Sequence, residues 1–194
     1  GLSDGSPSKR GARNDWGETR MKRIISLTVN NRAGVMNRIT GLFMKRQYNI
    51  ESITVGHAET PDVSRMTFVV NVECETKLEQ VIKQLHKQID VLKVHDVTDQ
   101  KVVVRELALI KVLTSTPQTR SELFSLIEPF RASVVDVSNS SLTIEVTGDS
   151  EKIDALIELV RPFGIKELSR TGVTALTRGT QKLESDIKPF SIIN

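Results

Sequence analysis

The sequence predicts an α+β protein made of two units that each follow the order β-α-β-β-α-β. Three observations support this prediction. Strand-like and helix-like hydrophobic periods alternate along most of the chain. Their order occurs twice, and a short polar stretch separates the two halves. The order is that of the ferredoxin-like fold, in which helices cover one face of an antiparallel sheet.

Composition narrows the class of protein. Of the 194 residues, 38% are hydrophobic and 26% charged, which is typical of a folded globular chain. The net charge of +3 steers a charged partner only weakly, so we expect no nucleic-acid partner. No run reaches the roughly 18 apolar residues of a membrane helix, and residues 1–20 contain no apolar stretch typical of a signal peptide. The single cysteine, Cys74, favours a reducing compartment, and we expect a cytoplasmic protein.

The first half begins after a Gly-, Ser- and Arg-rich segment that we expect to be disordered. Its helices are predicted from apolar residues at helical spacing, and its strands from alternation or β-branched runs. In order, we expect a strand at 24–29, a helix at 35–47, a strand at 50–55, a loop at 56–63, a strand around 66–72, a helix at 77–88 and a strand at 91–97.

The second half repeats this order without residue-level similarity. We expect a capping box of Thr119 and Glu122 to open its first helix. The elements are a strand at 106–113, a helix at 119–130, a hairpin of 133–137 and 141–147, a helix at 149–161 and a strand at 164–169. The resulting division is a disordered extension at 1–20, a first domain at 21–98, a linker at 99–105, a second domain at 106–180 and a tail at 181–194. Each domain has only about 75–80 residues, so we expect association.

The most informative stretch runs from Asn31 to Val35, at the first strand-to-helix turn. The first amides of a helix lack intrahelical partners and carry partial positive charge, which suits a carboxylate. Gly34 would let a ligand approach the backbone, and the Asn31 side chain offers both a donor and an acceptor. An amino acid needs both. Spacing alone favours a plain helix cap with a turn glycine, so both interpretations stay open.

A second stretch, Tyr48 to Ser52, connects the first helix to the second strand. By itself it is explained by a left-handed helix cap at Asn49. Catalytic patterns are sparse. The histidines His57, His86 and His95 have no metal-ligand spacing, and we expect no metal site. No nucleophile elbow, phosphate loop or dinucleotide fingerprint occurs, and the predicted central strands lack the aromatic residues of RNA-binding sheets.

Together these residues carry a family resemblance that covers about residues 21–180. The first half resembles the N-terminal ACT domain of acetohydroxyacid (acetolactate) synthase small subunits, through Asn31-Arg32-Ala33-Gly34-Val35, Arg38-Ile39, Gly41-Leu42-Phe43, Arg46 and Tyr48-Asn49-Ile50-Glu51-Ser52. The second half resembles the C-terminal domain of the family, through Arg105-Glu106-Leu107, Phe130-Arg131-Ala132, Val135-Asp136-Val137 and Arg170-Thr171-Gly172.

The resemblance implies a regulatory subunit with no catalytic residues or cofactor of its own. Its partner would be the large catalytic subunit, which carries thiamine diphosphate, Mg and FAD. The small subunit would activate this partner and confer feedback inhibition by valine, with leucine or isoleucine as weaker effectors. Two ACT domains would form a homodimer with the effector at their interface. The implied effector-binding residues are Asn31, Ala33, Gly34, Val35 and Met36 of one protomer, and Asn49 and Ile50 of the other.

Two other classes of function remain as alternatives. A free-standing amino-acid sensor would regulate some other protein and would not co-purify with a catalytic chain. A small ferredoxin-like hydrolase would show turnover by the isolated chain, although the sequence offers no nucleophile for it.

Overall fold

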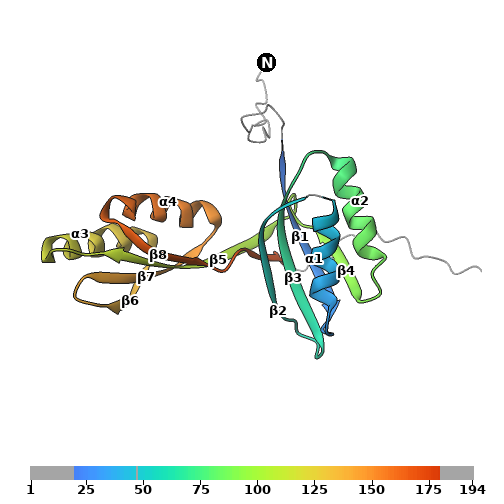
Figure 1. Cartoon of the computed structure of the whole chain (residues 1–194), viewed down its shortest axis with the longest axis horizontal. Coiled ribbons are helices and arrows are strands. Elements are labelled where there is room, and N and C mark those ends of the chain that lie inside the picture. The colour runs from blue at the N-terminus through green and yellow to red at the C-terminus, as the bar shows by residue number, and fades with distance from the viewer. Residues whose placement is uncertain (1–19, 47, 180–194) are drawn as a thin grey trace, which may run out of the picture. The chain divides into compact units, whose positions relative to one another are not determined.

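The computed structural model describes residues 20–46 and 48–179, which fall into two compact units divided between Asp99 and Gln100 (Figure 1). Residues 1–19 and 181–194, predicted to be an extension and a tail, lie outside the described residues. The predicted α+β class with two ferredoxin-like units is confirmed by the two sheets and their helices.

The N-terminal unit contains a four-stranded antiparallel sheet in the order β2-β3-β1-β4. Both helices cover the same face of this sheet, where they complete the apolar core (Figure 1). The elements are β1 (Met21–Asn30), α1 (Val35–Lys45), β2 (Asn49–His57), β3 (Val63–Val72), α2 (Glu75–His86) and β4 (Val91–Asp96). Strand β2 lies at one edge, and its outer side has no neighbouring strand among the described residues.

The core of this unit follows the predicted periods. On α1, Val35, Ile39 and Phe43 are buried, at the i, i+4 spacing that aligns side chains on one helix face. Phe43 stacks on Phe68 of β3, with ring centroids 4.8 Å apart. Burial of each such side chain is worth about 1.5–3 kcal/mol. The helix is therefore held by its apolar face, while its opposite side stays exposed.

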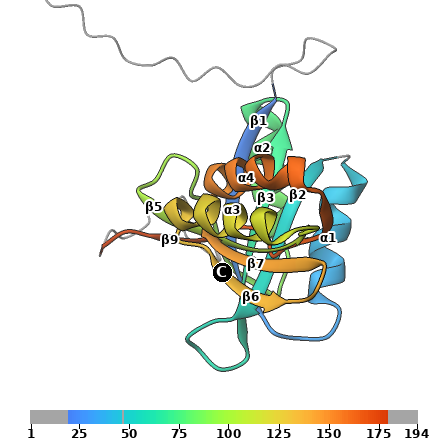
Figure 2. The same cartoon turned by 90° about the vertical axis from the view of Figure 1, so that its left-hand side faces the viewer.

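The C-terminal unit repeats the topology, with the sheet order β6-β7-β5-β8. Its helices α3 and α4 lie over the strands (Figure 2). The elements are β5 (Val102–Leu113), α3 (Pro117–Ile127), β6 (Ser133–Val137), β7 (Ser141–Gly148), α4 (Ser150–Val160), β8 (Ile165–Arg170) and β9 (Thr174–Thr177). Short 3-10 turns follow the helices, η1 at Glu128–Phe130 and η2 at Arg161–Phe163.

Two local predictions for this unit are wrong. Residues 102–105, predicted to be linker, form the first part of β5 and pair with β9, a strand that the sequence pattern does not predict. The capping box at Thr119 and Glu122 is absent from α3 as described. The helix begins earlier, at Pro117, and the Thr116 hydroxyl accepts a hydrogen bond from the amide of Thr119 at 3.1 Å. Proline suits the first helical position, because its missing N–H would have no intrahelical partner there.

Candidate functional site

The turn between β1 and α1 is held by backbone hydrogen bonds from two other connections of the same unit. The amide of Asn30 donates to the carbonyl of Asp90, between α2 and β4, at 2.8 Å. The amide of Asn31 donates to the carbonyl of Asp62, between β2 and β3, also at 2.8 Å. The turn is thus anchored where the strand ends, while residues 31–34 stay exposed.

Gly34 is the N-cap of α1, as the sequence predicts, and has φ 83 and ψ −8. Glycine adopts this left-handed conformation without the clash that a Cβ would cause. No side chain caps the helix, and its first turn contains no acidic residue. Among residues 20–46 and 48–179, no group accepts a hydrogen bond from the backbone amides of Ala33 and Gly34. Amides left open at a helix N-terminus can bind an anion.

The side chains of this turn divide into exposed and buried ones. Asn31 and Ala33 are exposed, and Met36 is 48% exposed. Val35 is only 4% exposed, because its side chain belongs to the core. Its amide makes a long 3.3 Å bond to the carbonyl of Arg32. Val35 therefore presents its backbone, and not its side chain, to this turn.

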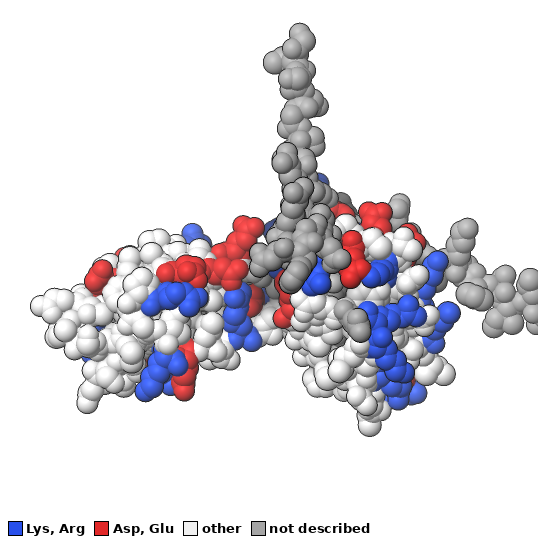
Figure 3. Space-filling view, turned by 45° about the horizontal axis from the view of Figure 1, so that its top comes forward, with Lys and Arg blue, Asp and Glu red and all other residues white. Residues whose placement is uncertain are grey.

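Three charged side chains that the site prediction does not include surround the same turn. The carboxylate of Asp90 is 6% exposed. It accepts a hydrogen bond from Arg38 Nη2 at 2.5 Å and lies 3.5 Å from Arg32 Nη1. Two guanidinium groups therefore share one carboxylate beside this turn. Lys and Arg side chains gather on the helix-bearing side of this unit (Figure 3).

Asn49 and Ile50 lie far from this turn within one chain. Asn30, at the end of β1, pairs with Val63 of β3, whereas Asn49, at the start of β2, pairs with Asn71 of β3. Those β3 positions are eight residues apart, or about 27 Å of strand. Asn49 is exposed and begins β2 with no positive φ, so the alternative of a left-handed helix cap at Asn49 is wrong. A single chain therefore brings together the predicted site residues from 31 to 36, but it does not bring Asn49 and Ile50 near them.

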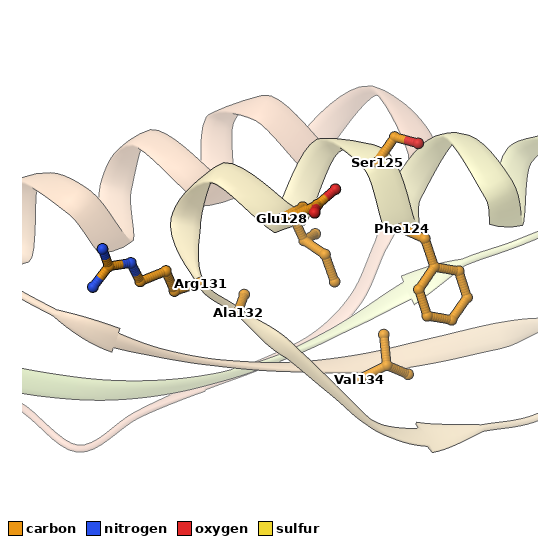
Figure 4. A pocket seen from close by; sticks show the side chains of 7 residues that line it. Phe124, Ser125, Glu128, Arg131, Ala132 and Val134 are labelled. Carbon is orange, nitrogen blue, oxygen red and sulfur yellow. The ribbon is translucent and has the colours of Figure 1, made fainter.

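The C-terminal unit contains an open groove of about 570 Å³ between the end of α3, η1 and β6 (Figure 4). Its lining combines apolar side chains with one carboxylate and one guanidinium: Phe124, Ser125, Ile127, Glu128, Arg131, Ala132 and Val134. No residue of the sequence-predicted site belongs to it.

The same unit contains a partly buried ion pair, with a buried carboxylate, at residues that carry the family resemblance. Arg170 donates from Nε to Glu106 Oε1 at 2.6 Å and from Nη2 to Oε2 at 3.1 Å, and its Nη1 reaches Asp154 at 2.6 Å. The hydrogen bond with Glu106 raises the pKa of the Arg170 guanidinium above its ordinary value. These contacts tie β8 to β5 and α4, so the structure gives Arg170 a stabilising role.

Neither a metal cluster nor a membrane-spanning helix occurs in the described part of the chain. Within the described residues, no group of three or more His, Cys, Asp or Glu side chains is placed to hold a metal ion. No helix of residues 20–46 and 48–179 is long and apolar enough to cross a membrane.

Comparisons with known proteins agree on one family. A family model described as the AHAS small subunit-like ACT domain matches residues 25–93. Another, described as the small subunit of acetolactate synthase, matches residues 105–179.

Individual relatives point the same way. The chain is 66% identical to the acetolactate synthase small subunit of Bacillus subtilis, over 89% of this chain and 100% of that one. It is 51% identical to a probable acetolactate synthase small subunit of Methanothermobacter thermautotrophicus, over 82% and 95%. Among solved structures, the acetolactate synthase small subunit of Thermotoga maritima matches with a TM-score of 0.75 and 36% identity, over 83% of this chain and 99% of that one. The chain therefore belongs to the family of acetolactate synthase small subunits.

Proposed function

We propose that this chain is a regulatory subunit that binds the catalytic subunit of acetolactate synthase, activates it and confers feedback inhibition by valine. Family membership and the ACT domain support a regulatory role. The catalytic partner would supply thiamine diphosphate, Mg and FAD, and this chain would supply the effector site.

The observation that carries the proposal is the separation of the two halves of the predicted site. Asn31 and Gly34 lie at one end of the sheet, and Asn49 and Ile50 at the other. They complete one site only if a second copy supplies the missing half. A dimer with a two-fold axis does this twice, because each surface meets its own equivalent.

The edge strand β2 offers a way to build this dimer. If the β2 strands of two copies pair antiparallel, Asn49 of one copy approaches the end of the sheet that carries Gly34 of the other. Exposed apolar side chains lie on β2 and α1: Val55 is 41%, Met36 48% and Met44 74% exposed. Pairing of β2 would join the two sheets through backbone hydrogen bonds, and burial of these side chains would add to the stability of the dimer.

In this site, the open amides at Gly34 and at the start of α1 bind the carboxylate of valine. The side chain of Asn31 binds its ammonium group, and Asn49 and Ile50 of the second copy close the pocket. Met36 and Ala33 provide exposed apolar contact for the isopropyl group. One methylene changes binding by only about 1–3 kcal/mol in such a pocket, so leucine and isoleucine act more weakly.

Inhibition then follows from linkage. Valine stabilises one arrangement of the ACT dimer, and this arrangement must differ in its contacts with the catalytic subunit for valine to change activity. Coupling free energies between sites are typically about 1–3 kcal/mol.

Calorimetric titration of valine into the wild-type chain and an Asn31→Ala variant tests the site. Asn139→Ala, in an exposed turn of the other unit, is the matched control. We expect binding by wild type and control, and loss of binding in Asn31→Ala. Equal binding by all three would place the site elsewhere. Absence of binding both to the isolated chain and to its complex with the catalytic subunit would refute valine as the effector.

A mixing experiment tests whether the site is shared between copies. Asn31→Ala and Asn49→Ala homodimers should each lose both sites. Mixed dimers regain one intact site, because each chain supplies the half that its partner lacks. After random exchange, about a quarter of all sites should bind valine. If the mixture binds no more valine than the separate variants, each site is built from a single chain.

A further inference from the structure

Asp90 carries a charged group in an almost buried position, although it belongs to a surface turn between α2 and β4. A buried carboxylate is costly unless its charge is compensated and its oxygens are hydrogen-bonded. Within residues 20–46 and 48–179, the partners of Asp90 all come from the β1–α1 region. Its carbonyl accepts the amide of Asn30 at 2.8 Å, and its carboxylate pairs with Arg38 and Arg32. The three residues that contact Asp90 lie at the end of β1, in the β1–α1 turn and in the first turns of α1, on both sides of Gly34.

Arg38 brings this charge network to the helix start. It lies one helical turn after Gly34, and side chains on a helix point back towards its N-terminus. Its Nη1 atom lies 3.4 Å from the position that a Cβ on Gly34 would occupy. Nη2 is bonded to Asp90 at 2.5 Å, which fixes the guanidinium plane. A positive group at the positive end of a helix is unfavourable by itself, so it depends on the carboxylate.

We infer that Asp90 is a positioning residue for the effector site, holding Arg38 against Gly34 and thereby fixing the shape of the 31–36 turn before any effector binds. The inference rests on the proposed function for its link to valine. Asp90 itself touches no effector in this scheme. It acts through Arg38 and through the end of β1.

A buried ion pair with a purely stabilising role would give a different result on mutation. Its loss would lower the stability of the whole unit without acting selectively on the 31–36 turn. The Arg23–Asp96 pair provides the comparison, because it also joins a guanidinium to a carboxylate at 2.9 Å in the same unit. It lies towards the opposite end of the sheet, where Ile25 faces Asp96. Asp96→Asn is therefore the matched control for Asp90→Asn.

The experiment uses the full chain with Asp90→Asn, Arg38→Met, the double variant and Asp96→Asn. Hydrogen exchange of the ligand-free proteins reports the order of residues 31–37. We expect faster exchange there in Asp90→Asn than in Asp96→Asn. Calorimetric titration should show valine binding roughly fivefold weaker, or more, in Asp90→Asn, and nearly unchanged in Asp96→Asn. In the Arg38→Met background, Asp90→Asn should add little further loss, because residues that act through one another are not additive.

Three outcomes would overturn the inference. These are equal exchange of residues 31–37 in Asp90→Asn and Asp96→Asn, unchanged or tighter valine binding in Asp90→Asn, and full additivity in the double variant. If wild type binds no valine even with the catalytic subunit, the proposed function fails, while the exchange comparison still decides whether Asp90 orders the turn.

Discussion

Gly34→Asp should abolish the valine response while leaving the fold and the activation of the catalytic subunit largely intact. The structural cost is small. A non-glycine residue at φ 83 costs about 1–2 kcal/mol. The new carboxylate would lie beside the Arg38 guanidinium, because Arg38 Nη1 is 3.4 Å from where the added Cβ would be. An exposed ion pair and the helix dipole return up to about 1 kcal/mol each. We therefore expect a net loss of stability of about 1 kcal/mol or less.

The effect on binding should be much larger. The introduced carboxylate would occupy the amides that we assign to the carboxylate of valine, and would repel it. Two hydrogen bonds to a charged group are worth at least about 3 kcal/mol, which weakens binding by about 100-fold or more. Calorimetric titration measures this change. Inhibition curves of the reconstituted complex, with activation measured in the absence of valine, show whether the effect is selective.

Two controls separate charge from shape. Gly34→Asn has nearly the same shape without the charge, and asparagine tolerates left-handed backbone, so it should retain more valine affinity. Gly41→Asp adds the same carboxylate to the same helix and should behave like wild type. Apart from its chain neighbours and the backbone of its own helix, no atom lies within 4 Å of the added Cβ. Wild-type valine sensitivity in Gly34→Asp, or equal losses in Gly34→Asp and Gly41→Asp, would refute the assignment of the site.

Other predictions concern stability and titration. Burial raises the pKa of Tyr48, the only tyrosine, above 10.0. Ultraviolet titration of its phenol should therefore have a midpoint above that of the unfolded chain. The stability that the neutral phenol contributes is present below pH 10 and is lost as the pH rises through the folded pKa. A midpoint at or below the unfolded one would contradict this. In denaturant titration, Glu106→Ala should destabilise the C-terminal unit by about 2–3 kcal/mol. This is less than for a fully buried pair, because the side chain of Arg170 is 30% exposed. Glu158→Ala, in an exposed pair, should leave the stability nearly unchanged. Phe43→Ala should cost about 3–5 kcal/mol in the same measurement, because the ring is fully buried; a cost below 1 kcal/mol would contradict the packing of the core.

Hydrophobic period and turn chemistry are enough to predict the fold. Val35, Ile39 and Phe43 give a helical period that the structure confirms as the buried face of α1. Gly34 is confirmed at the helix start, because few other residues suit its left-handed backbone. These signals are local, and the family resemblance adds a prediction of which residues bind the effector.

The features that the sequence did not predict depend on distant parts of the chain or on weaker local signals. Asp90 and Arg38 are 52 residues apart, and neither position by itself predicts an ion pair with a buried carboxylate. Strand β9 has only four residues, too few for a clear alternation, and it forms because β5 extends far enough to pair with it. The start of α3 has a readable signal, since Thr116 followed by proline is a typical cap, but the Thr119 and Glu122 pattern three residues later competes with it.

The two backbone anchors of the β1–α1 turn have a consequence for how such proteins diversify. The carbonyls that hold Asn30 and Asn31 belong to Asp90 and Asp62, in two separate connections with their own lengths and sequences. An insertion or deletion in either connection would shift an anchor and reshape the turn without altering any residue of the turn itself. Natural variation and directed evolution can therefore change the shape of this turn through two surface loops, while the residues from Asn31 to Met36 stay the same.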